Sequence, residues 1–100
     1  MATKPATEAE IVERLTRLPG WERQGDTIRK TYRMETYLAG LAFATAVGVI
    51  AEGLDHHPDI HIGWRKVIIS FTTHDAGNKL SLKDFMVAEA IEALPFTPGT

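Results

Sequence analysis

The sequence contains no cysteine, which excludes disulfide bonds, thiolate catalysis and zinc sites built on cysteine ligands. It also has no excess of positive charge, because 11 Lys and Arg residues stand against 13 Asp and Glu residues. The net charge of −2 gives no basic footprint, so nucleic acid is not expected as a main partner. No apolar run follows a basic start at the N-terminus, which argues against a signal peptide.

Long hydrophobic runs are missing as well. The longest uncharged run covers residues 36–51, contains two glycines and is too short to span a bilayer comfortably. We therefore expect no membrane partner and a cytoplasmic location. With 100 residues, 44% of them apolar and 24% charged, the chain has the composition of an ordinary globular protein. We expect residues 1–100 to form a single domain with its core at about 7–94.

The first third of the chain predicts a helix followed by a β-hairpin. Thr7 and Glu10 form a capping-box pattern, and apolar residues at helical spacing follow until Pro19-Gly20 ends the helix. The residues before Thr7 are expected to form a loose tail. Residues 21–24 and 27–34 are the two predicted strands, and the second alternates between a mostly apolar face and a polar face.

A second helix is predicted from Thr36, its N-cap, to about Leu54. No charged residue occurs between Thr36 and Ala51, so this helix is apolar nearly all round. Such a helix needs cover on more than one side, and one sheet covers only one side. A partner subunit is the natural second cover, and we therefore expect a homo-oligomer.

The last part of the chain predicts a second hairpin and a third helix. Residues 60–64 and 66–73 are the predicted strands, with one long bent strand as the alternative. A loop is expected at residues 75–79. The third helix starts at the cap pattern Ser81-x-x-Asp84 and ends at Leu94-Pro95.

The predicted order of elements is α-β-β-α-β-β-α, with residues 96–100 expected to fray. Strands and helices do not alternate in the way that a parallel sheet demands. The simplest arrangement is therefore an α+β two-layer sandwich, in which a four-stranded antiparallel sheet carries the helices on one face.

Two of the four histidines, His56 and His57, are adjacent and precede Pro58. Proline biases the preceding residue toward an extended conformation, so the pair is predicted to lie between a helix end and a strand start. Connections of this kind are common places for chemistry. A third histidine, His74, is predicted at a strand end, whereas His61 is expected to be a solvent-facing strand residue.

The spacing of these histidines and four other residues resembles a motif of the pterin-4a-carbinolamine dehydratases. That motif is Glu-x-x-x-His-His-Pro, then an aromatic residue six positions after the proline, a histidine ten positions later and an aspartate after a further loop. Its members in this chain are Glu52, His56, His57, Pro58, Trp64, His74 and Asp84. The resemblance implies a two-layer sandwich of two ββα units, assembled as a homodimer or a homotetramer.

The resemblance also implies an activity and a role for each matching residue. The family removes water from 4a-hydroxytetrahydropterin to give quinonoid dihydropterin, a step in tetrahydrobiopterin recycling. Carried onto this chain, His56 and His74 are the acid/base groups, and His57 binds the pterin substrate. The further substrate-binding positions are Glu52, Asp55, Pro58, Trp64, Thr72, Thr73 and Asp84. Asp55 stands where an asparagine is common in the vertebrate members.

Histidine suits this dehydration because its unperturbed pKa is about 6.5, close to the pH at which enzymes work. The leaving hydroxyl must receive a proton, and a ring nitrogen must lose one as the double bond forms. The reaction has no redox step and no attack by an outside nucleophile, so it requires neither a metal nor an organic cofactor.

Several of these residues also have plainer interpretations. Trp64 can be core or interface packing, and Asp84 can be a helix N-terminal carboxylate that holds the His74 loop. Glu52 either orients His56 or simply belongs to the last turn of its helix.

Two other functions compete with the dehydratase. One is a metal-dependent hydrolase, and its ligands would be His56, His57, His74 and either Glu52 or Asp55. The other is a non-enzymatic dimerisation or coactivator-type binding module.

Overall fold

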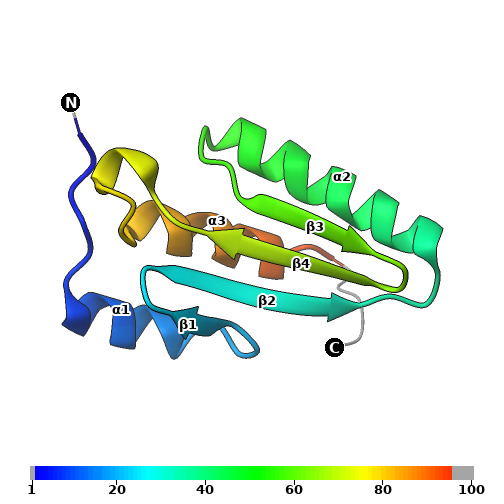
Figure 1. Ribbon diagram of the computed structural model, residues 1–100, viewed down its shortest axis with the longest axis horizontal. Coiled ribbons are helices and arrows are strands. Elements are labelled where there is room, and N and C mark those ends of the chain that lie inside the picture. The colour runs from blue at the N-terminus through cyan, green and yellow to red at the C-terminus, as the bar shows by residue number, and fades with distance from the viewer. Residues whose placement is uncertain (1, 96–100) are drawn as a thin grey trace.

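Four strands form one antiparallel sheet in the order β1-β2-β4-β3, and helices pack beside it (Figure 1). The computed structural model describes residues 2–95. The elements are α1 (Glu8–Leu15), β1 (Glu22–Gln24), β2 (Thr27–Arg33), α2 (Tyr37–Gly53), β3 (Asp59–Gly63), β4 (Lys66–Phe71), the short 3-10 helix η1 (His74–Ala76) and α3 (Leu82–Glu92). The predicted α+β order is confirmed, while the predicted fraying of residues 96–100 falls outside the described residues.

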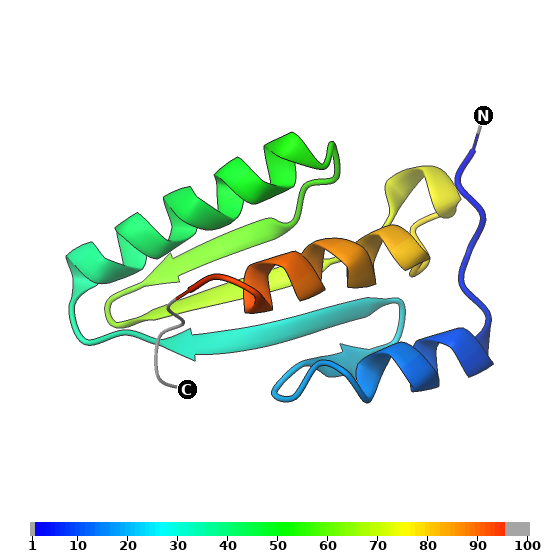
Figure 2. The same ribbon diagram turned by 180° about the vertical axis from the view of Figure 1, so that it is seen from behind.

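The α-helices lie on one side of the sheet, so the sheet has a covered face and a face that no described helix covers (Figures 1 and 2). Residues 28, 30 and 32 of β2 and residues 67, 69 and 71 of β4 are buried on the covered face. Their neighbours along each strand point to the opposite face, because side chains alternate with a period of two. The alternation predicted for residues 27–34 is therefore confirmed.

One charged side chain shares the buried face of β2. Lys30 is only 7% exposed, and its ammonium nitrogen lies 3.1 Å from Glu92 Oε2. The Tyr32 hydroxyl donates to the same carboxylate, and the Trp21 indole N–H donates to it at 3.3 Å. Burial, together with the bond to Glu92, raises the pKa of Tyr32. The end of α3 is thus fixed to β2 by a polar cluster in which each group has a partner.

Cap hydrogen bonds confirm where the sequence predicts each helix to begin. Thr7 and Glu10 bond each other reciprocally at the start of α1, and the Thr36 hydroxyl accepts from a backbone N–H at the start of α2. Ser81 and Asp84 form a second capping box at the start of α3. These bonds satisfy backbone N–H groups that the first helical turn leaves without an internal partner.

The second hairpin is confirmed, and the alternative of one long bent strand is wrong. Residues Gly63 and Lys66 pair across the turn, and Asp59 pairs with Ser70 at the other end of the hairpin. Trp64 therefore lies in the turn at one end, and the segment before Asp59 lies at the other end.

The prediction of a loose tail before Thr7 is wrong for the residues that the structure describes. The Ala6 N–H donates to the Leu80 carbonyl at 2.8 Å, and the Thr3 hydroxyl accepts from Lys83 Nζ at 2.9 Å. One backbone bond and one side-chain bond, which composition does not reveal, hold this segment beside the start of α3.

Helix α2 buries one side and exposes an apolar stripe on the other. Leu38 is 72% exposed and Val49 is 68% exposed, and their spacing of three helical turns places them on the same side. The expectation that the sheet covers only one side of α2 is confirmed, while the partner subunit stays a prediction. Within residues 2–95, no helix is long and apolar enough to cross a membrane. The cytoplasmic location stays a prediction.

Candidate active site

The topology brings the paired histidines and His74 to the same end of the sheet. The chain leaves α2 at Gly53, turns at Asp55 with a φ of 53°, and enters β3 at Asp59. Because β3 and β4 are antiparallel, the start of β3 lies beside the end of β4, where η1 begins with His74. Figure 1 shows the C-terminal end of α2 and the η1 turn at this same end of the molecule.

A buried carboxylate holds the ring of His56. Its Nε2 lies 2.6 Å from Asp84 Oδ1, and the side chains of His56 and Asp84 are 11% and 0% exposed. The ring also stacks on Phe71, with 6.1 Å between the ring centroids and 9° between the planes. The other carboxylate oxygen of Asp84 accepts from Thr73 Oγ1 at 2.8 Å and from the Ser81 N–H at 3.0 Å.

These contacts decide which nitrogen of His56 is available for chemistry. A carboxylate oxygen can only accept, so the bond to Asp84 assigns the shared proton to Nε2. In the neutral ring Nδ1 then carries the lone pair, and this nitrogen is the one that can take a proton. Phe71 on the ring face and Asp84 on the ring edge together give His56 a fixed direction.

His57 is held more loosely than His56. Its Nε2 lies 2.7 Å from Glu52 Oε1, and the two side chains are 56% and 81% exposed. An exposed pair of this kind contributes only about 0–1 kcal/mol to stability. Glu52 therefore contacts His57, and the interpretation in which it orients His56 is wrong because Asp84 occupies that role.

His74 is exposed and begins the turn that follows β4. Its Nδ1 lies 2.9 Å from Asn78 Oδ1, so Nδ1 donates and Nε2 is left for other partners. The turn needs two left-handed residues, Gly77 at a φ of 76° and Asn78 at 59°. Glycine and asparagine are the residues that adopt this conformation most readily.

The neighbouring Asp75 links this turn electrostatically to the rest of the site. A hydrogen bond from the Thr3 side chain, helped by the charges of Lys83 and His56, lowers the pKa of Asp75 below its usual range. One end of the sheet therefore carries a fixed imidazole, two more exposed imidazoles and an anionic side chain.

Comparison with known proteins identifies the family. The family model described as pterin 4 alpha carbinolamine dehydratase matches residues 4–94. The chain belongs to this dehydratase family.

Named relatives agree with the family match over nearly the whole chain. A protein of Roseiflexus sp. (strain RS-1), named as a candidate pterin-4-alpha-carbinolamine dehydratase, is 50% identical over 94 residues, which are 94% of this chain and 99% of that protein. A Chloroflexus aurantiacus (strain J-10-fl) protein with the same name is 43% identical over 88 residues, covering 88% of this chain and 94% of its own.

Two solved structures share the fold. A transcriptional coactivator/pterin dehydratase from Brucella melitensis superposes with a TM-score of 0.82 at 26% identity, covering 90% of this chain and 97% of that one. A pterin dehydratase-like protein identified as a RuBisCO assembly factor in the alpha-carboxysome superposes at 0.63 with 22% identity, covering 78% and 92%. This second likeness concerns the fold alone.

Not every residue assigned by the family motif lies with the histidines. Trp64 is in the β3–β4 turn, at the end of the hairpin away from His56, and is 76% exposed. The five residues of β3 separate the two ends by roughly 15–17 Å at about 3.3 Å per residue. Within one chain of this dehydratase family member, the structure does not bring Trp64 to the histidines.

The two threonines before His74 contact protein groups. The Thr73 hydroxyl is buried among Ser81 and Asp84, and the Thr72 hydroxyl donates to the Asp26 carbonyl at 2.8 Å. Thr73 thus supports Asp84 in this structure. Asp55 is exposed and Pro58 is half-buried, and both flank the histidine pair.

Sequence reasoning missed the residues that support the histidines. Phe71 under His56 and Asn78 beside His74 were visible only as strand and loop residues. The Ser81-x-x-Asp84 pattern indicated a helix start, but nothing in it pointed to His56. Within residues 2–95, no group of three His, Asp or Glu side chains is arranged to hold a metal ion.

Proposed function

We propose that this protein removes water from 4a-hydroxytetrahydropterin to give quinonoid dihydropterin, as a step in tetrahydrobiopterin recycling. The observation that carries the proposal is the His56–Asp84 pair, with 2.6 Å between Nε2 and Oδ1, at the end of the sheet where His57 and His74 also lie. Membership of the dehydratase family supports the same reaction class. A buried carboxylate is costly unless it is fully bonded, and here it orients an imidazole.

In the proposed reaction His56 is the base and His74 is the acid. His56 Nδ1 takes the proton from N5 of the pterin, and the electron pair of that N–H bond forms the N5=C4a double bond. His74 enters the step as the imidazolium, with one proton on Nδ1 toward Asn78 and a second on Nε2. The C4a–O bond breaks as His74 gives the Nε2 proton to the leaving hydroxyl, which departs as water. The substrate loses one proton and one hydroxide equivalent, and exchange with solvent restores both imidazoles. Positioned proton transfer of this kind contributes roughly 10²–10⁴-fold.

The remaining residues of the histidine end bind the pterin in this proposal. His57 contacts the substrate, and its hydrogen bond to Glu52 fixes which of its ring nitrogens carries the proton. Asp55 and Pro58 form the wall beside the pair, and Pro58 fixes the backbone through its restricted φ. The reaction needs no metal and no organic cofactor, because it moves protons only.

We also propose that the protein works as a homodimer or homotetramer whose contacts include the exposed stripe of α2. Leu38 and Val49 lie on that stripe and are 72% and 68% exposed. Apolar side chains repeated along one side of a helix favour a packed partner.

The competing function is a non-enzymatic binding module. Two observations favour it: the exposed stripe of α2, and the coactivator name carried by the Brucella melitensis structure. The two functions differ in what they require from the histidines. A binding module keeps its partner when His56 and His74 are both replaced by alanine, whereas a dehydratase loses its turnover.

The direct test generates the 4a-carbinolamine and follows its decay by absorbance with and without the protein. We expect acceleration by the parent protein, and a loss of about 10²-fold or more in His74→Ala and in His56→Ala. The matched control is His61→Ala, because His61 is exposed on β3 outside the site and its removal should leave the rate unchanged. Decay at the uncatalysed rate with pure, folded protein would overturn the proposal.

A further inference from the structure

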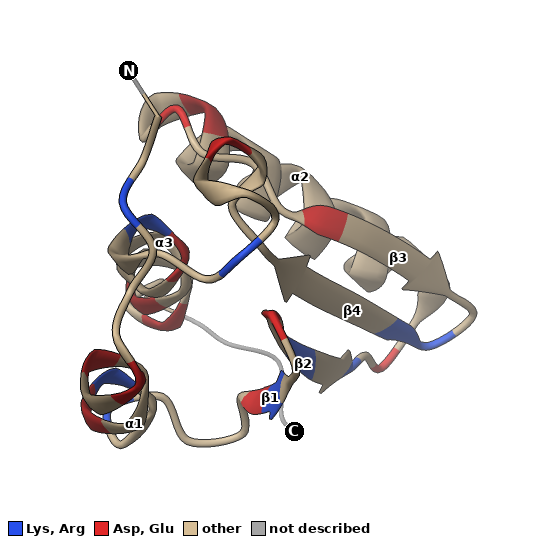
Figure 3. Ribbon diagram, turned by 60° about the vertical axis from the view of Figure 1, so that its left-hand side comes forward, with Lys and Arg blue, Asp and Glu red and all other residues tan. Residues whose placement is uncertain are grey.

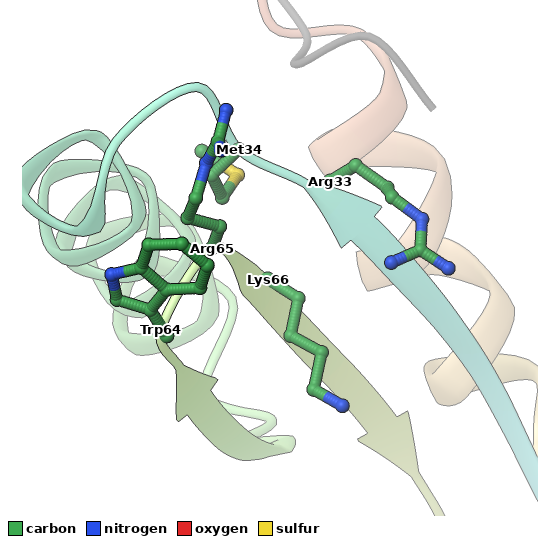
Figure 4. A pocket seen from close by; sticks show the side chains of 5 residues that line it. All are labelled: Arg33, Met34, Trp64, Arg65 and Lys66. Carbon is green, nitrogen blue, oxygen red and sulfur yellow. The ribbon is translucent and has the colours of Figure 1, made fainter.

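A second candidate site lies at the opposite end of the sheet from the histidines. A hollow of about 570 Å³ is lined by Arg33, Met34, Trp64, Arg65 and Lys66 (Figure 4). These residues come from the end of β2 and the position after it, from the turn between β3 and β4, and from the first residue of β4. The pairing of Arg33 with Lys66 and the 2.9 Å bond from the Met34 N–H to the Arg65 carbonyl join the two sides.

Three of the five lining side chains are cations. Within residues 2–95, none of Arg33, Arg65 and Lys66 forms an ion pair. Figure 3 shows basic positions at the β3–β4 turn and acidic positions on α1. Unpaired cations that share a hollow attract an anion, and a planar guanidinium binds phosphate or carboxylate through two parallel bonds.

The other two lining residues provide an apolar surface. Trp64 is 76% exposed, which is unusual for the largest aromatic side chain, and the Arg65 guanidinium lies 5.3 Å from its ring centre. In Figure 4 Trp64 and Arg65 lie side by side, with Lys66 and Arg33 across from them. An exposed indole is a stacking surface for a flat ring such as a nucleobase.

We propose that this hollow binds a small phosphorylated compound with a flat ring, such as a mononucleotide. The ring stacks on Trp64, and the phosphate lies between Arg33 and Lys66. The volume of about 570 Å³ falls within the roughly 300–1,000 Å³ of small-molecule sites. The net charge of −2 and the grouping of three cations in one small hollow favour a small anion over a nucleic acid.

This site is independent of the proposed dehydration. The two ends of the β3–β4 hairpin carry different chemistry: imidazoles and buried carboxylate at one, guanidinium, ammonium and indole at the other. Lys66→Gln should therefore leave carbinolamine decay unchanged, and His74→Ala should leave ligand binding unchanged.

The test titrates the 100-residue protein with ADP and follows the two indole N–H signals by NMR. The chain has 2 tryptophans, so Trp64 reports on the hollow while the buried Trp21 reports on the fold. We expect the Trp64 signal to shift with ADP while the Trp21 signal stays in place. Adenosine, which lacks the charge, and pyrophosphate, which lacks the ring, should each bind at least about tenfold more weakly.

Charge and stacking are then separated by variants. Lys66→Gln and Trp64→Leu should each weaken ADP binding by about tenfold, since each removes one half of the recognition. The matched control is Arg17→Gln, which removes one exposed cation in the turn after α1 and should leave the affinity unchanged. Added salt should weaken ADP binding more than adenosine binding, because only the phosphate contact is screened.

Three results would overturn the proposal. One is an unmoved Trp64 signal at several millimolar ADP. Another is equal weakening by Arg17→Gln and Lys66→Gln, which indicates general charge attraction. The third is a Trp64 signal protected from a soluble quencher in the assembled protein, since the ring is then covered by a partner.

Discussion

Replacing Asp84 with asparagine tests how the protein prepares His56. The change keeps the size of the side chain, but it turns one carboxylate oxygen into an NH₂ group that can only donate. Asp84 accepts three hydrogen bonds through its two oxygens: from His56 Nε2, from the Thr73 hydroxyl and from the Ser81 N–H. An asparagine cannot accept on both sides, so the hydrogen bonding on one side must change.

The two orientations of the new amide have different costs. With its oxygen toward Ser81, the NH₂ group faces His56, which satisfies it only by moving the imidazole proton from Nε2 to Nδ1. With its oxygen toward His56, the NH₂ group meets the Ser81 N–H, and leaving that buried donor unpaired costs roughly 1–3 kcal/mol. The first orientation is therefore favoured by about 5- to 150-fold, and His56 loses its Nδ1 lone pair in the same proportion.

We therefore expect kcat for carbinolamine decay to fall by about 5- to 150-fold in Asp84→Asn, with a smaller change in KM. ¹⁵N NMR of the imidazoles should show the proton of His56 on Nδ1. Asp26→Asn, in the exposed β1–β2 turn, is the control for the loss of a carboxylate. An Asp84→Asn enzyme with the parent kcat, or with its proton still on Nε2, would refute the reasoning.

Three further changes test other parts of the structure. Thr3→Val should raise the pKa of Asp75 toward its ordinary value, which an NMR titration measures. Because the folded pKa is the lower one, the stability that the Thr3–Asp75 contact adds is present above about pH 4 and is lost as the pH falls. Urea unfolding at two pH values measures this loss. Glu92→Gln should lower the unfolding free energy by about 2 kcal/mol in urea, since it leaves a buried ammonium without its anion. Val49→Asp should shift the protein to a smaller assembly in light scattering.

Each of these changes has its own control and its own contrary outcome. An unchanged pKa of Asp75 in Thr3→Val would contradict the contact between Thr3 and Asp75. Glu89→Gln on the same helix loses a more exposed pair and should cost only about 0–1 kcal/mol, so equal losses at Glu89 and Glu92 would contradict the argument from burial. Val12→Asp on α1 is equally exposed and should leave the assembly intact; the same shift in both valine variants would mean general destabilisation.

Features fixed by neighbouring residues could be predicted from the sequence. The caps at Thr7, Thr36 and Ser81 depend on side chains within a few positions, and all three form as predicted. The alternation along β2 correctly placed even Lys30 on the buried face, although the sequence did not show its partner Glu92, 62 positions later. Local chemistry gave the elements, and the pairing between distant elements had to come from the structure.

In the candidate site too, some features could be predicted from the sequence and others could not. The spacing of His56, His57 and His74 indicated a shared site, and strand pairing places their segments at one end of the sheet. The identity of each supporting contact did not follow, because Asp84 looks like an ordinary cap residue in the sequence. Trp64 shows the converse: its position fits the family spacing, yet the hairpin turn carries it away from the histidines.

Asp84 both caps α3 and holds the ring of His56, and this has a consequence while the chain is being synthesised. All three histidines of the site are synthesised before Asp84, which belongs to the last helix. Until that helix docks, His56 lacks the partner that fixes its proton on Nε2, and the growing polypeptide carries every imidazole without the arrangement that the proposed dehydration requires. Regain of activity during refolding should accordingly keep step with the arrival of the C-terminal helix and lag behind formation of the sheet.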